Sequence, residues 1–155
     1  MDFVGPRYRS YYPVGRLDYN TSGLILLTND GDLAVRMTHP KYEIERVYTA
    51  EVRGNVSDPT LKKLGAGVEL EDGMIKMKVE VQANKKDTTV LSLTLKEGRN
   101  RIIRRTMKRL GHPVQKLKRM RHGPFAIGGL SSGELRKLSE RDYQIMRKKV
   151  VEPVK

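Results

Sequence analysis

Two short segments in which every second residue is apolar constrain the fold more than any other feature of this chain. The apolar positions are Ile75, Met77, Val79 and Val81 in the first segment, and Leu91, Leu93 and Leu95 in the second. A period of two is that of a half-buried β-strand. The polar residues 84–87 between the segments favour a turn. The pattern therefore predicts a hairpin over residues 74–96 and a sheet with one buried face.

Shorter signals complete the expected element order. Apolar runs predict strands at 11–14, 24–28, 47–52 and 114–121, with a loop over 15–23. Helices are expected at 30–37, where Asp30 is a typical N-cap, at 58–65, where Asp58 precedes a proline, and at about 100–110. Ser139, with Asp142 three residues later, resembles a capping box that opens a C-terminal helix. Adjacent strands with interspersed helices predict an α+β fold with a largely antiparallel mixed sheet flanked by helices.

The net charge and the missing residue types restrict the class of protein. The 155 residues suffice for one domain, and their net charge of +13 indicates a polyanionic partner such as nucleic acid. The longest apolar run, Leu24 to Leu27, is far shorter than the roughly 20 residues of a membrane span. The start MDFVGPRYRS has no secretory signal, so we expect a cytoplasmic protein. The absence of cysteine excludes disulfides and thiol catalysis, and three scattered histidines predict no local metal site.

The positive charge is concentrated in residues 99–121, which contain ten basic residues and no acid. Within the expected helix, the basic residues fall on one face and the apolar residues on the other. The basic face consists of Arg101, Arg104, Arg105, Lys108 and Arg109. A solvated face normally mixes signs, so this one favours phosphate binding over a merely soluble basic surface. The predicted RNA-binding residues are Arg99, Arg101, Arg105, Lys108, Arg109, Lys116, Lys118, Arg119 and Arg121.

Asp18, in the stretch GRLDYNTSGLILLTNDGD at 15–32, allows three interpretations. Turn chemistry alone favours a turn residue. Asp18, Asn20 and Ser22 also occupy the first ligand positions of an EF-hand calcium loop. The twelfth position of that loop requires a glutamate, however, and Asn29 stands there. The third interpretation is a reactive carboxylate held on a rigid loop, and the residues by themselves leave it open.

The amino-acid sequence of this stretch resembles the signature of a known family. GRLDYNTSGLILLTNDGDLAVRMTHP is similar to the signature loop of the RsuA-type pseudouridine synthases, which modify ribosomal RNA. Two further blocks match in order, ERVYTAEV at 45–52 and EGRNRIIRR at 97–105, and the second is followed by LKRMRHGPF at 117–125. The resemblance covers about residues 11–140, and three ordered motifs are far more specific than one. It implies the pseudouridine synthase fold.

The resemblance also implies the roles of individual residues. Asp18 would be the catalytic nucleophile, Tyr48 would stack on the target base, and Arg104 would pair with Asp18. Arg16 and Leu17 would complete the substrate-binding residues, with Leu17 helping to exclude water. Such enzymes need no cofactor or metal. The family usually carries an N-terminal S4-type RNA-binding domain, so residues 1–155 are expected to be a catalytic domain from which the S4 domain is absent.

The expected substrate is one uridine of ribosomal RNA or of a pre-ribosomal particle, acted on by a monomer. Asn100-Arg101 is closer to the large-subunit branch of the family, which favours 23S over 16S ribosomal RNA. The alternative from another class is a non-catalytic RNA-binding module that retains the fold. Both interpretations predict salt-sensitive RNA binding, because phosphate contacts release counterions.

Overall fold

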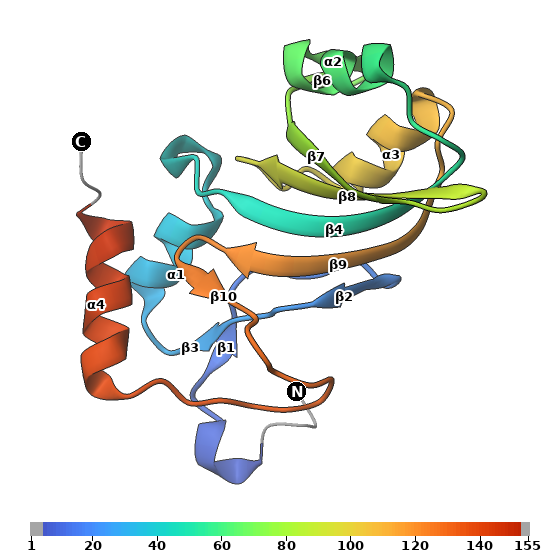
Figure 1. Cartoon of the computed structure of the whole chain (residues 1–155). Helices are drawn as coiled ribbons and strands as arrows, with labels where there is room; N and C mark the ends of the chain where they lie inside the picture. Colours follow the sequence, from blue (N-terminus) through green and yellow to red (C-terminus); the bar gives the residue numbers. More distant parts are fainter. Residues whose placement is uncertain (1–4, 153–155) are drawn as a thin grey trace.

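The computed structural model describes residues 5–152 as a set of short strands and four α-helices (Figure 1). The ends of the expected 1–155 domain, residues 1–4 and 153–155, lie outside the described residues. The strands are β1 (Tyr12–Pro13), β2 (Thr21–Gly23), β3 (Leu27–Thr28), β4 (Arg46–Arg53), β5 (Val68–Leu70), β6 (Gly73–Ile75), β7 (Lys78–Asn84), β8 (Thr88–Leu95), β9 (Val114–His122) and β10 (Phe125–Ala126). The helices are α1 (Gly31–Thr38), α2 (Asp58–Ala66), α3 (Ile102–Arg109) and α4 (Glu140–Val151), with 3-10 turns at Pro6–Tyr8 and Pro40–Tyr42.

A six-stranded sheet forms the centre of the molecule (Figure 1). Its strand order is β10-β9-β4-β8-β7, and β2 pairs with β9 as well. The β2–β9 pair is parallel and the other pairs of this sheet are antiparallel. The predicted α+β fold with a largely antiparallel mixed sheet is therefore confirmed. Two small antiparallel pairs, β1–β3 and β5–β6, lie outside the main sheet.

The predicted hairpin forms between β7 and β8, but its first strand begins later than expected. The backbone N–H of Lys85 donates to the Thr88 carbonyl at 2.9 Å across the turn, and Leu91, Leu93 and Leu95 of β8 are buried. Ile75 belongs instead to β6, which pairs with β5. Met77 is also buried, and its N–H donates to the Leu64 carbonyl at 2.9 Å. The alternating pattern therefore does not belong to a single strand: Ile75 lies in β6, Met77 lies between β6 and β7, and the two strands belong to different sheets.

Helices α2 and α3 cover one face of the sheet and enclose the larger core (Figure 1). The apolar face predicted for α3 is confirmed, since Ile102, Ile103, Thr106 and Met107 are buried. These side chains pack with the inward residues of β4, β8 and β9. The main core residues of the sheet are Ala50, Val52, Leu91, Leu93, Leu95 and Leu117. Within residues 5–152, no helix is long and apolar enough to cross a membrane.

Of the three helix starts predicted from capping residues, two are confirmed and one is corrected. Asp30 Oδ1 accepts the Leu33 N–H at 3.1 Å at the start of α1, and Ser139 Oγ accepts the Asp142 N–H at 3.1 Å at the start of α4. These two caps are confirmed. In α2 the N-cap is Ser57, and Asp58 is already the first helical residue. The helix begins there because the proline at its second position has no N–H to leave unpaired.

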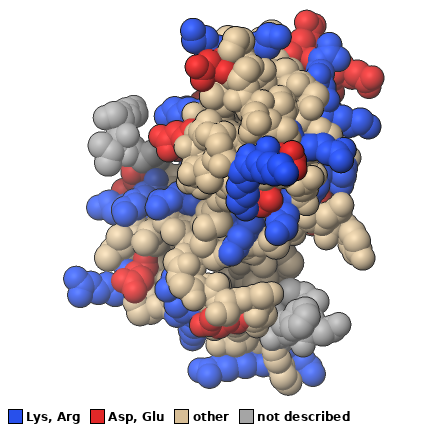
Figure 2. Space-filling model, turned by 45° about the vertical axis from the view of Figure 1, so that its right-hand side comes forward, with Lys and Arg blue, Asp and Glu red and all other residues tan. Residues whose placement is uncertain are grey.

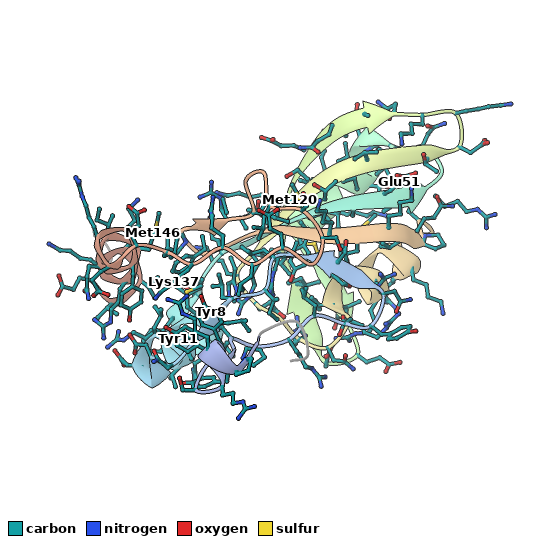
Figure 3. All side chains as sticks on the ribbon, turned by 90° about the horizontal axis from the view of Figure 1, so that it is seen from below. Tyr8, Tyr11, Glu51, Met120, Lys137 and Met146 are labelled. Carbon is teal, nitrogen blue, oxygen red and sulfur yellow. The ribbon has the colours of Figure 1, made fainter. Side chains whose placement is uncertain are left out.

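A second core lies at one end of the sheet and contains residues from Val14 to Val150. It contains residues of α1, β10 and α4, and Met120 and Met146 border it (Figure 3). Asp30 connects its helices, because the carboxylate that caps α1 also accepts hydrogen bonds from Tyr143 and from Arg147 of α4, the latter at 2.9 Å. These contacts hold the pKa of Asp30 at about 2, with the Tyr143 hydrogen bond as the largest cause. The C-terminal helix is therefore fastened to α1 by polar as well as apolar contacts.

The stretch 15–28 departs from the predicted loop and strand. The strand expected at 24–28 is reduced to Leu27–Thr28, while residues 21–23 of the expected loop form β2 beside β9. Gly23 has a φ of 111°, and a Cβ there would lie 2.2 Å from the Arg119 carbonyl oxygen. Only glycine permits this approach of the two backbones. Of the four apolar residues after it, Leu24 is buried, Ile25 is 39% exposed, and Leu27 alone belongs to a strand.

Candidate active site

A cavity of about 520 Å³ lies where the 15–21 loop meets β4, the 97–104 segment and β9. Its volume is in the range of ligand pockets. All five residues that the resemblance assigned to catalysis and substrate binding line it: Arg16, Leu17, Asp18, Tyr48 and Arg104. These residues come from three segments that are far apart in the sequence. The fold therefore brings together what the motifs predicted as a group.

A tight turn positions Asp18 at the cavity wall. The Thr21 N–H donates to the Asp18 carbonyl at 2.9 Å, so the loop reverses direction immediately after the carboxylate. The first interpretation, a turn residue, is thus correct for the backbone of Asp18. Its half-buried side chain faces the cavity and remains available for chemistry. The strand β1 precedes residues 18–29, and β2 and β3 lie within them, which contradicts the single loop between two helices that an EF-hand requires.

Arg104 holds the Asp18 loop by its backbone. The guanidinium Nη2 donates to the Asn20 carbonyl at 2.7 Å. Among the ion pairs of residues 5–152, none joins Arg104 to Asp18 within 4 Å. Burial is the largest cause that lowers the pKa of Arg104, Arg101 lowers it further, and the charge of Asp18 raises it. The two charges therefore interact across the cavity, while the direct hydrogen bond goes to the loop.

Tyr48 lies in β4, at the centre of the sheet. It is half-buried, and it lies opposite Leu93 of β8 on one side and Arg119 of β9 on the other. The pairing of β4 with β9 shifts between Val47 and Tyr48. A bulge of this kind redirects side chains. The aromatic ring of Tyr48 consequently forms part of the cavity wall beside a buried arginine.

Two buried residues of the cavity were missed by the sequence analysis, Arg46 and His122. Arg46 is 7% exposed and donates to the carbonyls of Ile44 at 2.9 Å and Met37 at 3.2 Å. His122 is 1% exposed, and its Nε2 lies 3.0 Å from the same Met37 carbonyl. Burial, followed by the charges of Arg119 and Arg46, lowers the pKa of His122 to about 3. Both residues stood inside the matched blocks, which was the only signal for them.

The buried polar side-chain atoms of the described chain that lack a hydrogen-bond partner all belong to residues of this cavity. In residues 5–152, four buried side-chain atoms have no hydrogen-bond partner within the protein, and all four belong to residues that line this cavity. They are Thr21 Oγ1, Arg104 Nε, Arg119 Nη2 and His122 Nδ1. Leaving a buried polar group unpaired costs about 1–3 kcal/mol. Their concentration at one place indicates a site built to receive a polar ligand.

The basic face of α3 is less uniform than predicted. Arg105 forms a bidentate salt bridge with the Asp72 carboxylate, with N···O distances of 2.8 and 2.9 Å. Arg99 donates to the backbone carbonyls of Asp72 and Met74 and contacts Glu97. On the face in Figure 2, acidic side chains likewise lie among the basic ones. Counting charges within 99–121 missed these acids, because they come from other parts of the chain.

The predicted basic patch on β9 divides between the two faces of the sheet. Arg119 is 3% exposed and lines the cavity, so it is not part of an exposed patch, and its predicted contact with RNA stays a prediction. Lys116 and Lys118 lie on the opposite face, where they border a hollow of about 320 Å³ with Glu51 and Met120 (Figure 3). Alternation along a strand is the physical reason. The remaining exposed cations of the prediction are Arg101, Lys108, Arg109 and Arg121.

Residues 5–152 contain no cluster of three or more His, Cys, Asp or Glu side chains that could hold a metal ion. The side chains that line the cavity supply several kinds of chemical group. These are a carboxylate, an aromatic ring, several guanidinium groups and a neutral imidazole, arranged around a space that fits a small polar ring.

Comparison with known proteins agrees with this arrangement. The family model described as RNA pseudouridylate synthase matches residues 5–109. The chain is 45% identical to the ribosomal large subunit pseudouridine synthase B of Bacillus subtilis (strain 168), over 94% of this chain and 61% of that protein. It is 41% identical to the protein of the same name from Pseudomonas aeruginosa, over 94% of this chain and 39% of that protein. The chain thus spans between two fifths and three fifths of these relatives.

Solved structures show the same likeness. A crystal structure of a pseudouridylate synthase superimposes with a TM-score of 0.83 at 28% identity, over 92% of this chain and 63% of that one. The archaeal box H/ACA sRNP Nop10–Cbf5 complex contains a chain that matches with a TM-score of 0.57 at 17% identity, which shows a shared fold. With the family model matching more than half of its residues, this chain belongs to the RNA pseudouridylate synthase family.

Proposed function

We propose that this chain is the catalytic domain of a pseudouridine synthase that acts on large-subunit ribosomal RNA, with Asp18 as its nucleophile. The observation that carries the proposal is the meeting of Asp18, Tyr48 and Arg104 at one cavity lined by unpaired polar atoms. The names of the 41–45% identical relatives support the choice of large-subunit RNA. The substrate would be free ribosomal RNA or a pre-ribosomal particle, and the working form a cytoplasmic monomer.

The reaction requires little beyond these side chains. Converting uridine to pseudouridine breaks the bond from C1′ to N1 and forms one from C1′ to C5. The C5 hydrogen leaves as a proton and N1 gains a proton, so the product is an isomer and no redox partner or external group is consumed. The Asp18 carboxylate would attack C1′ of the ribose or C6 of the base, and either attack frees the base to rotate.

The remaining residues would bind and orient the nucleotide. A uridine inside RNA has to leave its stack, at a cost of a few kcal/mol. Stacking on Tyr48 and contacts of phosphates with the exposed cations Arg101, Lys108 and Arg109 would offset that cost. Arg104 would keep the Asp18 loop in place through its bond to Asn20, and half-buried Leu17 would keep water from the detached base.

The test is the substitution Asp18→Asn, which removes the negative charge and keeps the size of the side chain. Ribosomal RNA from a strain lacking the gene, supplied with wild type or variant, is mapped for pseudouridine by carbodiimide modification. We expect Asp18→Asn to abolish the modified site while RNA affinity stays within a few-fold of wild type. Asp58→Asn is the matched control, because Asp58 is exposed on α2, away from the cavity.

The result also separates the enzyme from a non-catalytic RNA-binding module. A module binds RNA in both forms and restores no modified site in either. Restoration of the site by Asp18→Asn would show that another group is the nucleophile.

A further inference from the structure

The deep wall of the cavity is formed by β4 and β9, and two pairs of residues lie opposite each other there. Tyr48 is paired with Arg119, and Arg46 with His122. Directly opposed residues of an antiparallel pair point to the same face of a sheet and lie close together. The register shift after Val47 keeps both pairs on the cavity side, although Arg119 and His122 are three residues apart. A base stacked on Tyr48 would therefore present its edge to Arg119 and His122.

His122 offers a hydrogen-bond acceptor at this wall. Its Nε2 lies 3.0 Å from the Met37 carbonyl, and a carbonyl can only accept, so the ring proton is on Nε2. The other nitrogen, Nδ1, then carries a lone pair. It is buried and has no partner within residues 5–152. A buried acceptor without a partner in the protein is hydrogen-bonded only when a ligand supplies a donor.

Arg119 offers a donor at the same wall. Its Nε donates to the Leu24 carbonyl at 2.9 Å, which fixes the guanidinium between β9 and the residue that follows β2. The Nη2 group is buried and has no partner in the described part of the chain. The two side chains are 3% and 1% exposed, so neither can rotate into solvent to satisfy these groups. Both residues line the cavity, so its wall contains one buried, unpaired donor and one buried, unpaired acceptor.

We propose that Arg119 and His122 recognise the edge of the target uracil, with His122 Nδ1 accepting from N3–H and Arg119 Nη2 donating to a neighbouring carbonyl oxygen. This inference rests on the proposed function and names the residues that select the base. Cytosine has a lone pair at N3, which would face the lone pair of His122. Such a mismatch leaves buried polar groups unpaired, and sites of this kind reject the wrong ligand strongly.

The experiment uses the intact wild-type chain and three mononucleotides: UMP, CMP and 3-methyl-UMP, whose methyl group replaces the N3 hydrogen. Binding is followed by ¹⁵N NMR of the three histidine rings and by the ring signals of Tyr48. We expect UMP to shift the His122 Nδ1 resonance. We expect CMP and 3-methyl-UMP to leave it in place and to bind roughly 5- to 150-fold more weakly, the range for one unpaired buried group.

Two variants make the assignment specific. His122→Phe should lose the preference for UMP over 3-methyl-UMP, with a thermal melt confirming that the variant is folded. His112→Phe is the matched control, because the His112 ring also bonds to a backbone carbonyl, that of Arg53 at 2.7 Å, but does not line the cavity. The preference should remain intact in this control.

Three results would overturn the inference. They are equal binding of UMP and 3-methyl-UMP, UMP binding at Tyr48 with an unmoved His122 resonance, and no UMP binding up to its solubility limit. These readouts do not depend on turnover, so they are separate from the Asp18→Asn test. An enzyme whose His122 does not respond would keep the proposed function and lose this mode of base recognition.

Discussion

Replacing Gly23 by alanine should destabilise this protein severely, because two backbones meet at this residue. The new Cβ would lie 2.2 Å from the oxygen, 2.5 Å from the nitrogen and 2.9 Å from the carbonyl carbon of Arg119. All three are backbone atoms of β9, a central strand, so they cannot relieve the clash by a change of rotamer, as a flexible side chain would. β2 would have to move away from β9, and the contacts on either side of Gly23 would be strained with it.

The free-energy cost follows from three contributions. The φ of 111° disfavours any residue with a Cβ, at about 1–2 kcal/mol. Forcing an additional carbon into a packed contact costs about 1–3 kcal/mol. The Leu24 N–H bond to the Arg119 carbonyl at 2.8 Å, and the Arg119 Nε bond to the Leu24 carbonyl, contribute about 0.5–1.5 kcal/mol each. We therefore expect a loss of roughly 3–8 kcal/mol, a large part of the usual stability of a domain.

Gly111→Ala is the matched control, measured beside Gly23→Ala by urea denaturation. Gly111 has a φ of 83°, and a Cβ there would meet no atom within 4 Å, so only the conformational cost applies. The free energy of unfolding should fall by about 1–2 kcal/mol in the control. Equal losses in the two variants would refute the close approach of β2 to β9 and, with it, the position of Arg119 at the cavity wall.

Three other predictions concern the contacts of Asp30, the basic face of α3 and the N-cap of α4. Asp30 has a folded pKa of about 2 against an ordinary 3.8, so its contribution to stability is present above pH 4 and is lost as the pH falls towards 2. The free energies of unfolding of wild type and Asp30→Asn, measured by urea denaturation, should therefore differ by about 1–2 kcal/mol at pH 7 and converge near pH 2, and a constant difference would contradict the assignment. Lys108→Ala should reduce the salt dependence of RNA binding by about one phosphate contact, measured by filter binding over a salt series. Arg105→Ala should change that slope less, because Asp72 already neutralises Arg105, and an equal change in both variants would show that the pair opens on RNA. Ser139→Ala should remove the α4 cap, which costs about 1 kcal/mol of stability and lowers the melting temperature. Ser131→Ala should leave the melting temperature unchanged, because Ser131 bonds to Glu134 through its backbone N–H.

Much of the secondary structure was predictable because the decisive interactions are local. Alternation in β8 matched the sheet period, the apolar residues of α3 matched the helical period, and Asp30 and Ser139 capped the helices that they begin. Each of these signals depends on residues within a few positions of one another. The 75–77 alternation misled the prediction of a single strand, because a period of two does not specify the partner strand.

The motifs by themselves singled out Asp18, Tyr48 and Arg104, and these three residues line one cavity. The tertiary structure decided how they are held and what surrounds them. Contacts between distant segments place Arg104 on the Asn20 carbonyl, pair Arg105 with Asp72 and bury Arg119 and His122 at the wall. A linear pattern records charge and hydrophobicity but not the atom that ends up opposite a given group, and hydrogen bonding depends on that atom. For this reason the proposed nucleophile could be named from the sequence, whereas the arrangement behind the proposed base recognition emerged only from the fold.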